Sequence, residues 1–307
     1  MTTEASSLTG PLVTGQPAEL ASIAWSAVSR LDDRSLEAFV DAHDLQRTNV
    51  LNLANVRFGT PSGLVGLLLA AETARRYHDS VVINLKDDEF RRYLSRSRFI
   101  EFASPTCRLV PGLSEREGIR FAHRYGRSKD LIELTRLEVA EDLRGLIERT
   151  IDTLTEGLGY SRRQAFRVVT MVSEAGMNLI EHAGIHGYAA LQSYSPPSGR
   201  FVELAIGDAG RGIRDRLREN VSFTATPSDI AAIKLAVRPG VSTFGPSRGI
   251  GLAGLVTATR AHGGSLQVRS GTGRVRIRAG RPQLLPFEGA RFPGTQITIT
   301  LPAVVAA

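Results

Sequence analysis

The 307-residue chain is poor in several residue types, and each shortage excludes a class of protein. Cys107 is the only cysteine, which rules out a disulfide framework and a thiolate metal cluster and suits a reducing compartment. The densest apolar run, Leu64 to Ala71, is far shorter than the roughly 20 residues that cross a bilayer. Residues 1–17 lack the basic start and apolar middle of a signal peptide and are predicted to be a disordered tail. We therefore expect a cytoplasmic protein without a membrane span.

Aromatic residues are also scarce, at 6% of the chain, although the formal net charge is +7. Arg269, Arg274, Arg276 and Arg278 alternate along a predicted strand, and we expect them to face outward. Such a row of arginines is one way to bind nucleic acid or anionic lipid. No aromatic side chains are interleaved with these arginines, and no nucleic-acid-binding signature accompanies them. We therefore favour a solubilising face over a nucleic-acid site.

The hydrophobic content of 42% and charged content of 22% are ordinary for a globular protein of one or two domains. Residues 18–104 form the first predicted unit, in which helices and strands alternate. The pattern predicts helices over Leu31 to His43, Leu64 to Ala74 and Glu89 to Phe99, and strands over Val50 to Phe58 and Ser80 to Leu85. This alternation indicates a partly parallel sheet covered by helices, so the fold class is α/β.

Residues 105–136 are predicted to be a linker with an early strand over Gly118 to Arg124, and residues 137–303 to be a second domain. In that domain a helix over Leu137 to Leu158 precedes a central helix. Strands are predicted over Ala189 to Tyr194, Arg200 to Ile206, Ser265 to Arg278 and Gly294 to Leu301.

The central stretch, VVTMVSEAGMNLIEHAG, covers Val168 to Gly184. Its apolar residues recur at helical spacing, which predicts a helix packed on a sheet. Glu174, Asn178 and His182 recur every four residues and so lie on one strip of that helix. A carboxylate can orient a water molecule, and an amide oxygen is a hard ligand suited to Mg²⁺. Taken alone, the strip favours the simpler interpretation, the polar edge of a half-buried helix.

Two glycine-rich turns follow the central helix. AIGDAGRGI places Asp208 where a strand ends, and Gly210 and Gly212 leave room for a ligand near the backbone. SRGIGLAGL starts another helix at Gly249 and Gly251, where free backbone N–H groups suit phosphate oxygens. Paired glycines alone usually mark ordinary loops. The three segments in this order and spacing are much more specific.

These motifs resemble those of the ATPase domain shared by gyrase, the heat-shock-ninety chaperones, histidine kinases and MutL, over roughly Leu137 to Pro302. The resemblance implies a Bergerat-type two-layer α/β sandwich with a mixed sheet. It also implies a magnesium ion on Asn178, a water or acceptor hydroxyl activated by Glu174, and adenine bound by Asp208. Gly210 and Gly212 would shape the base pocket, Gly249 and Gly251 would bind phosphates, and Thr295 would support the aspartate.

The Glu-x-x-x-Asn form of the motif, with His182 beyond it, is most similar to the anti-sigma-factor serine kinases and related small ATPases. Arg214 to Ser247 has the place and length of their ATP lid, with a short helix over Ser228 to Ala236. Arg248 is our preferred phosphate-neutralising residue, ahead of Lys234 and Arg238. His182 and His186 are interpreted as packing or capping residues rather than metal ligands.

The first unit resembles the STAS domain, in which a strand leads into a phosphorylatable turn, a glycine and an apolar helix. Aligning on Gly63 places Thr60 at the aspartate of that turn and Pro61 at its phosphoacceptor serine. Proline has no hydroxyl, so Thr60 or Ser62 would have to substitute, and we favour ordinary turn roles for both. We therefore expect a fixed docking module or a degenerate one instead of the usual phospho-switch.

Two functions stay open. In the first, the chain is a magnesium- and ATP-dependent regulator that hydrolyses ATP or phosphorylates Ser/Thr of a protein partner, of STAS or sigma-regulator type. In the second, it is a non-catalytic, nucleotide-dependent binding module that sequesters its partner. A homodimer is possible through the helix over Leu137 to Leu158. A histidine kinase is disfavoured because no phosphoacceptor helix with a histidine box precedes the ATPase domain.

Overall fold

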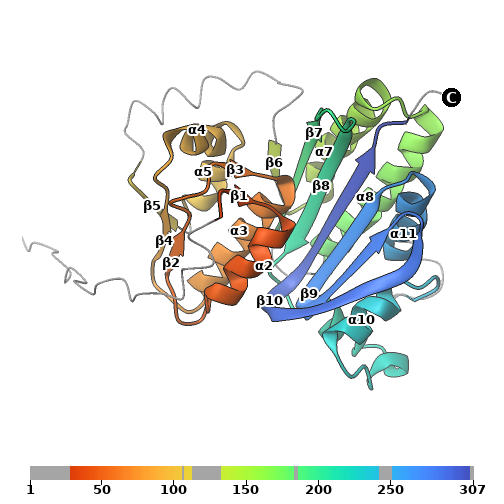
Figure 1. Ribbon diagram of the computed structural model, residues 1–307. Helices are drawn as coiled ribbons and strands as arrows, with labels where there is room; N and C mark the ends of the chain where they lie inside the picture. The colour runs from red at the N-terminus through yellow and green to blue at the C-terminus, as the bar shows by residue number, and fades with distance from the viewer. Residues whose placement is uncertain (1–27, 106, 113–132, 183–185, 242–250, 305–307) are drawn as a thin grey trace, which may run out of the picture.

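The computed structural model describes residues 28–105, 107–112, 133–182, 186–241 and 251–304. It has an amino-terminal unit of short strands and helices and a carboxy-terminal unit built on a five-stranded sheet (Figure 1). The predicted α/β class is confirmed at this level. Among the described residues, none of the helices combines the length and apolar character that spanning a membrane requires.

The amino-terminal unit has a small parallel sheet with strand order β2-β4-β5, and β1 pairs with β3 in parallel beside it. Its strands are β1 (Arg30–Leu31), β2 (Val50–Asn52), β3 (Phe58–Gly59), β4 (Val81–Asn84) and β5 (Cys107–Val110). Its helices are α2 (Asp33–Ala42), α3 (Pro61–Arg75), α4 (Asp88–Arg96) and α5 (Phe99–Ala103).

Local sequence explains where these helices begin. Asp32 accepts the N–H groups of Arg34 and Ser35, and the Ser35 hydroxyl accepts the Asp32 N–H, which forms a capping box at the start of α2. Thr60 caps α3, and Pro61 follows at the first helical position, where its missing N–H costs nothing. Nearly every residue of α3 is buried, so this helix lies inside the molecule.

The carboxy-terminal unit is a sheet of order β6-β7-β8-β10-β9 in which every described pairing is antiparallel, so the predicted mixed sheet is wrong for these strands. Its strands are β6 (Glu133–Leu137), β7 (Gly187–Tyr194), β8 (Phe201–Asp208), β9 (Ser265–Arg278) and β10 (Arg281–Pro302). Its helices are α7 (Ala140–Asp152), α8 (Arg162–His182), α9 (Gly212–Leu217), α10 (Asp229–Ala236) and α11 (Gly251–Ala261), with a π-helical η1 (Thr153–Gly157) and a 3-10 turn η2 (Val221–Phe223).

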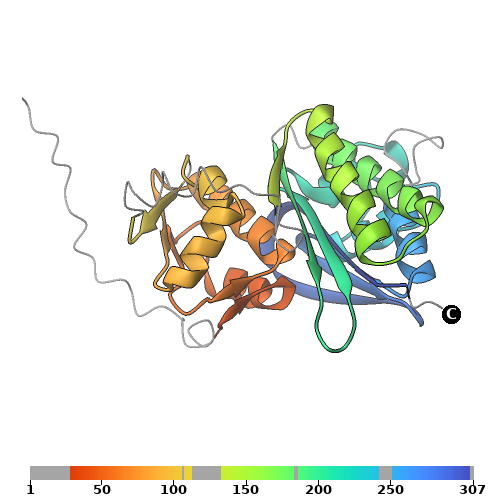
Figure 2. The same cartoon turned by 90° about the horizontal axis from the view of Figure 1, so that it is seen from above.

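The two faces of this sheet are covered by different parts of the chain (Figures 1 and 2). Helices α7, α8 and α11 cover one face, which we call the helical face, and their apolar side chains share one core with Leu204, Ile206 and Ile297. The opposite face, which we call the docked face, shares a second core with the amino-terminal unit, through Tyr188, Ala205 and the leucines of α3. The predicted two-layer sandwich therefore has a third layer, because the second face of the sheet is also apolar and buried.

Several predicted boundaries differ from the observed ones. The strand predicted over Val50 to Phe58 is two strands, β2 and β3, separated by a turn. The helix predicted over Glu89 to Phe99 breaks at Arg98, whose φ is 65°, into α4 and α5. Strand β5 extends the first sheet beyond residue 104, and β6 starts the second sheet before residue 137. The strand predicted over Gly118 to Arg124 lies outside the described residues.

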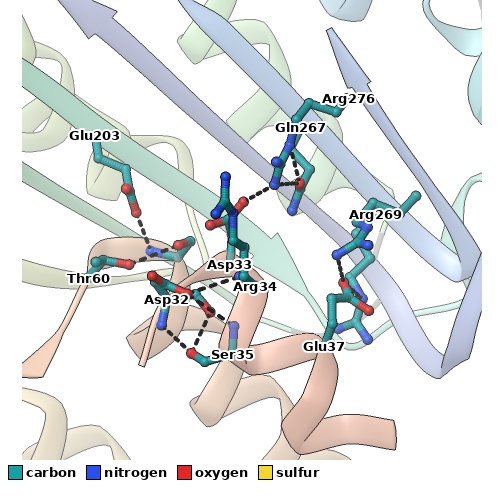
Figure 3. Close-up of polar contacts among 12 residues, drawn as sticks. Asp32, Asp33, Arg34, Ser35, Glu37, Thr60, Glu203, Gln267, Arg269 and Arg276 are labelled. Carbon is teal, nitrogen blue, oxygen red and sulfur yellow. Dashed lines mark hydrogen bonds and ion pairs between the residues drawn. The ribbon is translucent and has the colours of Figure 1, made fainter. Parts of the chain in front are cut away.

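The predicted outward row of arginines is wrong for three of its members, because their side chains bind carboxylates of α2. Figure 3 shows Arg269 and Arg276 in these contacts. Arg269 Nε lies 3.0 Å from Glu37 Oε1, and Arg274 Nη1 lies 3.3 Å from the same oxygen. Arg276 pairs with Asp33 and also donates to Gln267. These strand positions face the docked side of the sheet, so the charge pattern serves contact between the two units.

Candidate functional site

The polar strip of α8 lies beside its buried stripe. Val172, Ala175 and Leu179 are buried in the core of the helical face, whereas Glu174 is half-buried and Asn178 is exposed. Gly176 lets α7 approach, since a Cβ at this position would lie 2.4 Å from a methyl carbon of Leu143. The predicted helix is therefore confirmed, with Glu174 and Asn178 accessible along one side. The side chain of His182 lies outside the described residues.

Asp208 occupies the last position of β8 and is only 8% exposed. Its Oδ1 accepts the Gly210 N–H at 2.7 Å, which turns the chain away from the strand. Burial raises the pKa of the Asp208 carboxyl to about 6, although hydrogen bonds from Gly210 and Thr295 and the charges of Arg216 and Arg76 oppose this rise. The buried surroundings thus disfavour the charged form of this carboxyl group, and such shifted pKa values are common at functional sites.

Thr295 lies directly opposite Asp208 in the pairing of β10 with β8, so the two side chains share the helical face. The glycine before it is required by close packing, because a Cβ on Gly294 would lie 2.0 Å from the Asp208 carbonyl oxygen. Gly212 has a φ of +83°, which only glycine adopts easily. The Ser270 hydroxyl holds this turn by accepting the Ile213 N–H and donating to the Gly294 carbonyl.

Arg216 of α9 connects the end of β8 with α8. Its Nη1 donates to the Asn178 carbonyl oxygen at 3.4 Å, and its charge also acts on the Asp208 carboxyl. Asp208 and Thr295 thus lie together at one end of the helical face, and Arg216 connects this end to the backbone of α8 at Asn178. Sequence reasoning did not single out Arg216. The arginine-rich run RGIRDRLR after the glycine turn was the available signal.

Part of the predicted phosphate-binding segment lies outside the described residues, namely Arg248 and Gly249. Gly251 is the first residue of α11, a helix that packs against α8. The predicted short helix over Ser228 to Ala236 is confirmed as α10, with Ser228 as its N-cap. Ala232 and Ile233 of α10 are buried, so this part of the predicted lid is a packed helix instead of a free loop.

The turn that resembles the STAS phosphoacceptor lies against the docked face (Figure 3). Thr60 is 1% exposed and Ser62 is not exposed at all. The Ser62 N–H donates to Glu203 Oε1 at 3.0 Å, and its carbonyl accepts Gln296 Nε2 at 2.8 Å. Burial raises the pKa of the Glu203 carboxyl, opposed by hydrogen bonds from Ser62 and Thr60. A kinase cannot reach either hydroxyl in this arrangement, so both serve packing.

Within the described residues, no group of three or more His, Cys, Asp or Glu side chains is arranged to hold a metal ion. His186 instead contacts Glu72 of α3, Tyr188 and Arg136, across the boundary between the two units. The magnesium role of Asn178 rests on its amide oxygen and stays a prediction.

No protein-family model matches this chain, and no curated protein matches it either.

Proposed function

We propose that the carboxy-terminal unit binds ATP with Mg²⁺ at the end of the helical face, between Asp208, the polar strip of α8 and the start of α11. The observation that carries this proposal is that Thr295 lies opposite Asp208, and that Arg216, whose charge acts on Asp208, donates to the backbone carbonyl of Asn178. The sheet with α7, α8 and α11 on one face also fits the Bergerat fold that the sequence resembles, and the amino-terminal parallel sheet fits a STAS-like unit.

The polar groups at this end of the helical face suit a nucleotide. A carboxylate offers about four acceptor positions, and the Asp208 carboxylate uses part of them for the N–H groups of Gly210 and Thr295. The remaining capacity would accept a hydrogen bond from the amino group of adenine. The exposed amide of Asn178 offers the oxygen that Mg²⁺ prefers. When bound, the metal would neutralise phosphate charge.

The chain's own residues have distinct tasks in this proposal. Asp208 holds the base and Thr295 supports it from the neighbouring strand. Glu174, one helical turn before Asn178, orients a water molecule or removes the proton of an acceptor hydroxyl. The acceptor belongs to a protein partner, because Thr60 and Ser62 of this chain are buried. The protein would thus be a cytoplasmic regulator acting by ATP hydrolysis or Ser/Thr phosphorylation.

The first test is nucleotide binding by isothermal titration calorimetry with Mg²⁺. Asp208→Ala should lose at least tenfold in ATP affinity, since a buried hydrogen-bonding group is removed. Glu101→Ala, a change at the exposed ion pair with Arg98, is the matched control and should bind normally. If the wild-type chain shows no affinity for ATP or ADP, the proposal is wrong.

The second test separates an enzyme from a binding module. Glu174→Ala should retain ATP binding but lose turnover by about 10²- to 10⁴-fold, measured as labelled phosphate released or transferred to STAS-type proteins. A chain that binds ATP but shows no turnover even in the wild type would be the non-catalytic module. Label found on Thr60 or Ser62 of this chain would contradict the buried role of the turn.

A further inference from the structure

A hollow of about 560 Å³ opens beside α9 at the end of the sheet, away from the polar strip of α8. Five arginines line it: Arg76, Arg211, Arg214, Arg218 and Arg291. They come from three segments far apart in the chain, namely the end of α3, helix α9 and strand β10. Both units of the molecule therefore contribute to this hollow.

The hollow adjoins the proposed nucleotide site, because Gly210 of the turn after Asp208 lines it, but its arginines lie outside that site. Arg211, Arg214 and Arg218 recur at spacings of three and four, so they share one side of α9. Arg216 lies on another side of the same helix, where it reaches the Asn178 carbonyl. Of the residues that the structure describes in α8 and α11, none lines the hollow. The arginines of the hollow and Arg216 thus lie on different sides of α9.

The arginine charges in the hollow are largely uncompensated. Asp215 and Asp229 also line it, which leaves a formal excess of three positive charges. Arg214 and Arg218 donate to the Thr226 carbonyl, and Arg76 donates to that of Ala209. Arg211 alone of the five pairs with a carboxylate, that of Glu219, within the ranges the structure describes. Carbonyl contacts hold the guanidinium groups in place but do not cancel their charge.

The lining also excludes apolar ligands. None of the described lining residues is aliphatic or aromatic, and the remaining ones are Ser270 and the glycines 210, 271 and 294. An acyl chain would find few apolar contacts there. Guanidinium groups match phosphate oxygens in geometry and charge. At roughly 30 Å³ for one water molecule, the volume admits several anionic groups.

We propose that this hollow is a second binding site, specific for a polyphosphate group. Inorganic polyphosphate and the phosphate tail of a nucleotide present the same chemistry. Recognition is by guanidinium groups from both units, so a bound ligand joins α3 to α9 and β10. Binding does not need Mg²⁺, because the arginines supply the positive charge that the metal supplies elsewhere.

The test is calorimetric titration of the full chain with inorganic tripolyphosphate in EDTA. Arg211→Ser with Arg291→Ser removes the two exposed rim charges and should weaken binding roughly tenfold or more. The matched control, Arg162→Ser with Arg163→Ser, removes two exposed charges at the start of α8 and should bind normally. Lysine at positions 211 and 291 should restore most of the affinity at low salt. Equal binding by the rim and control variants, or no binding by the wild type, overturns the proposal.

Two further measurements distinguish free polyphosphate from nucleotide tails, and the hollow from the proposed nucleotide site. In EDTA, with Asp208→Ala, ATP that binds more tightly than tripolyphosphate assigns the hollow to nucleotide tails, and equal or weaker binding assigns it to free polyphosphate. Tripolyphosphate affinity that is lost in Asn178→Ala but kept in the rim variant overturns the second site. Failure of Asp208-dependent binding would leave this result untouched, so the two proposals are tested separately.

Discussion

The two faces of the five-stranded sheet use the same strands in opposite ways. Along β8, Val202, Leu204 and Ile206 point to the helical face, whereas Glu203 and its alternate neighbours point to the docked face. The helical face has an aliphatic core with polar groups at one end. The docked face mixes apolar packing with ion pairs and a buried carboxyl. The buried charged groups of the docked face thus lie where the two units contact each other, whereas the charged groups at the end of the helical face belong to the candidate site.

The largest expected effect lies in the ion pairs of the docked face. Glu37→Ala should lower the free energy of unfolding by about 3–5 kcal/mol, because it leaves the buried Arg269 without its carboxylate. Glu219→Ala breaks the exposed pair with Arg211 and should cost at most about 1 kcal/mol. Urea unfolding measures both. Similar costs for the two variants would show that the docked-face pair is solvated.

Core substitutions on the two faces test whether the units unfold together. Leu69 packs against Gly207 on the docked face, and Leu179 packs against Gly187 on the helical face. Leu69→Ala and Leu179→Ala should each cost about 2–5 kcal/mol and keep one cooperative transition, since the sheet joins both cores. Calorimetry would contradict this if Leu69→Ala gave two transitions, with the second unchanged from wild type.

Asp208→Asn should stabilise the protein at neutral pH, by about 1–3 kcal/mol. The Asp208 pKa is raised from 3.8 to about 6, so the folded state holds the proton more tightly than the unfolded state. The wild type therefore loses stability as pH rises through this interval, and the advantage of the variant should vanish below about pH 4. Unfolding at pH 4 and 7.5 measures the difference. ATP binding by the wild type should likewise weaken as Asp208 is protonated below about pH 6.

Asn178→Ala should have the smallest effect on stability, within about 0.5 kcal/mol, because the side chain is exposed and alanine favours helix. The stabilisation that Mg-ATP gives in a thermal shift assay should nevertheless fall. Equal ligand-dependent shifts in wild type and variant would remove Asn178 from the proposed metal role.

Much of the element order was predictable from periodicity. The stripe from Val168 to Ile180 predicted α8, because its apolar residues recur with the period of a helix. The alternation around Arg200 to Ile206 predicted β8, because it has the two-residue period of a strand. Boundaries were less accurate where turns are short, as between β2 and β3. That Asp208 and Asn178 serve one site was predicted only through the family resemblance and stays a prediction, since periodicity does not show which distant segments lie together.

The sequence by itself determined the helices, the strands and the chemistry offered by Glu174, Asn178 and Asp208, because local spacing controls which side chains share a face. Only the tertiary structure decided that α3 lies against the sheet, that Arg269 and Arg276 meet carboxylates of α2, and that five arginines surround one hollow. The physical reason is that an alternating strand offers two faces, and which partner covers each is set by packing between distant segments.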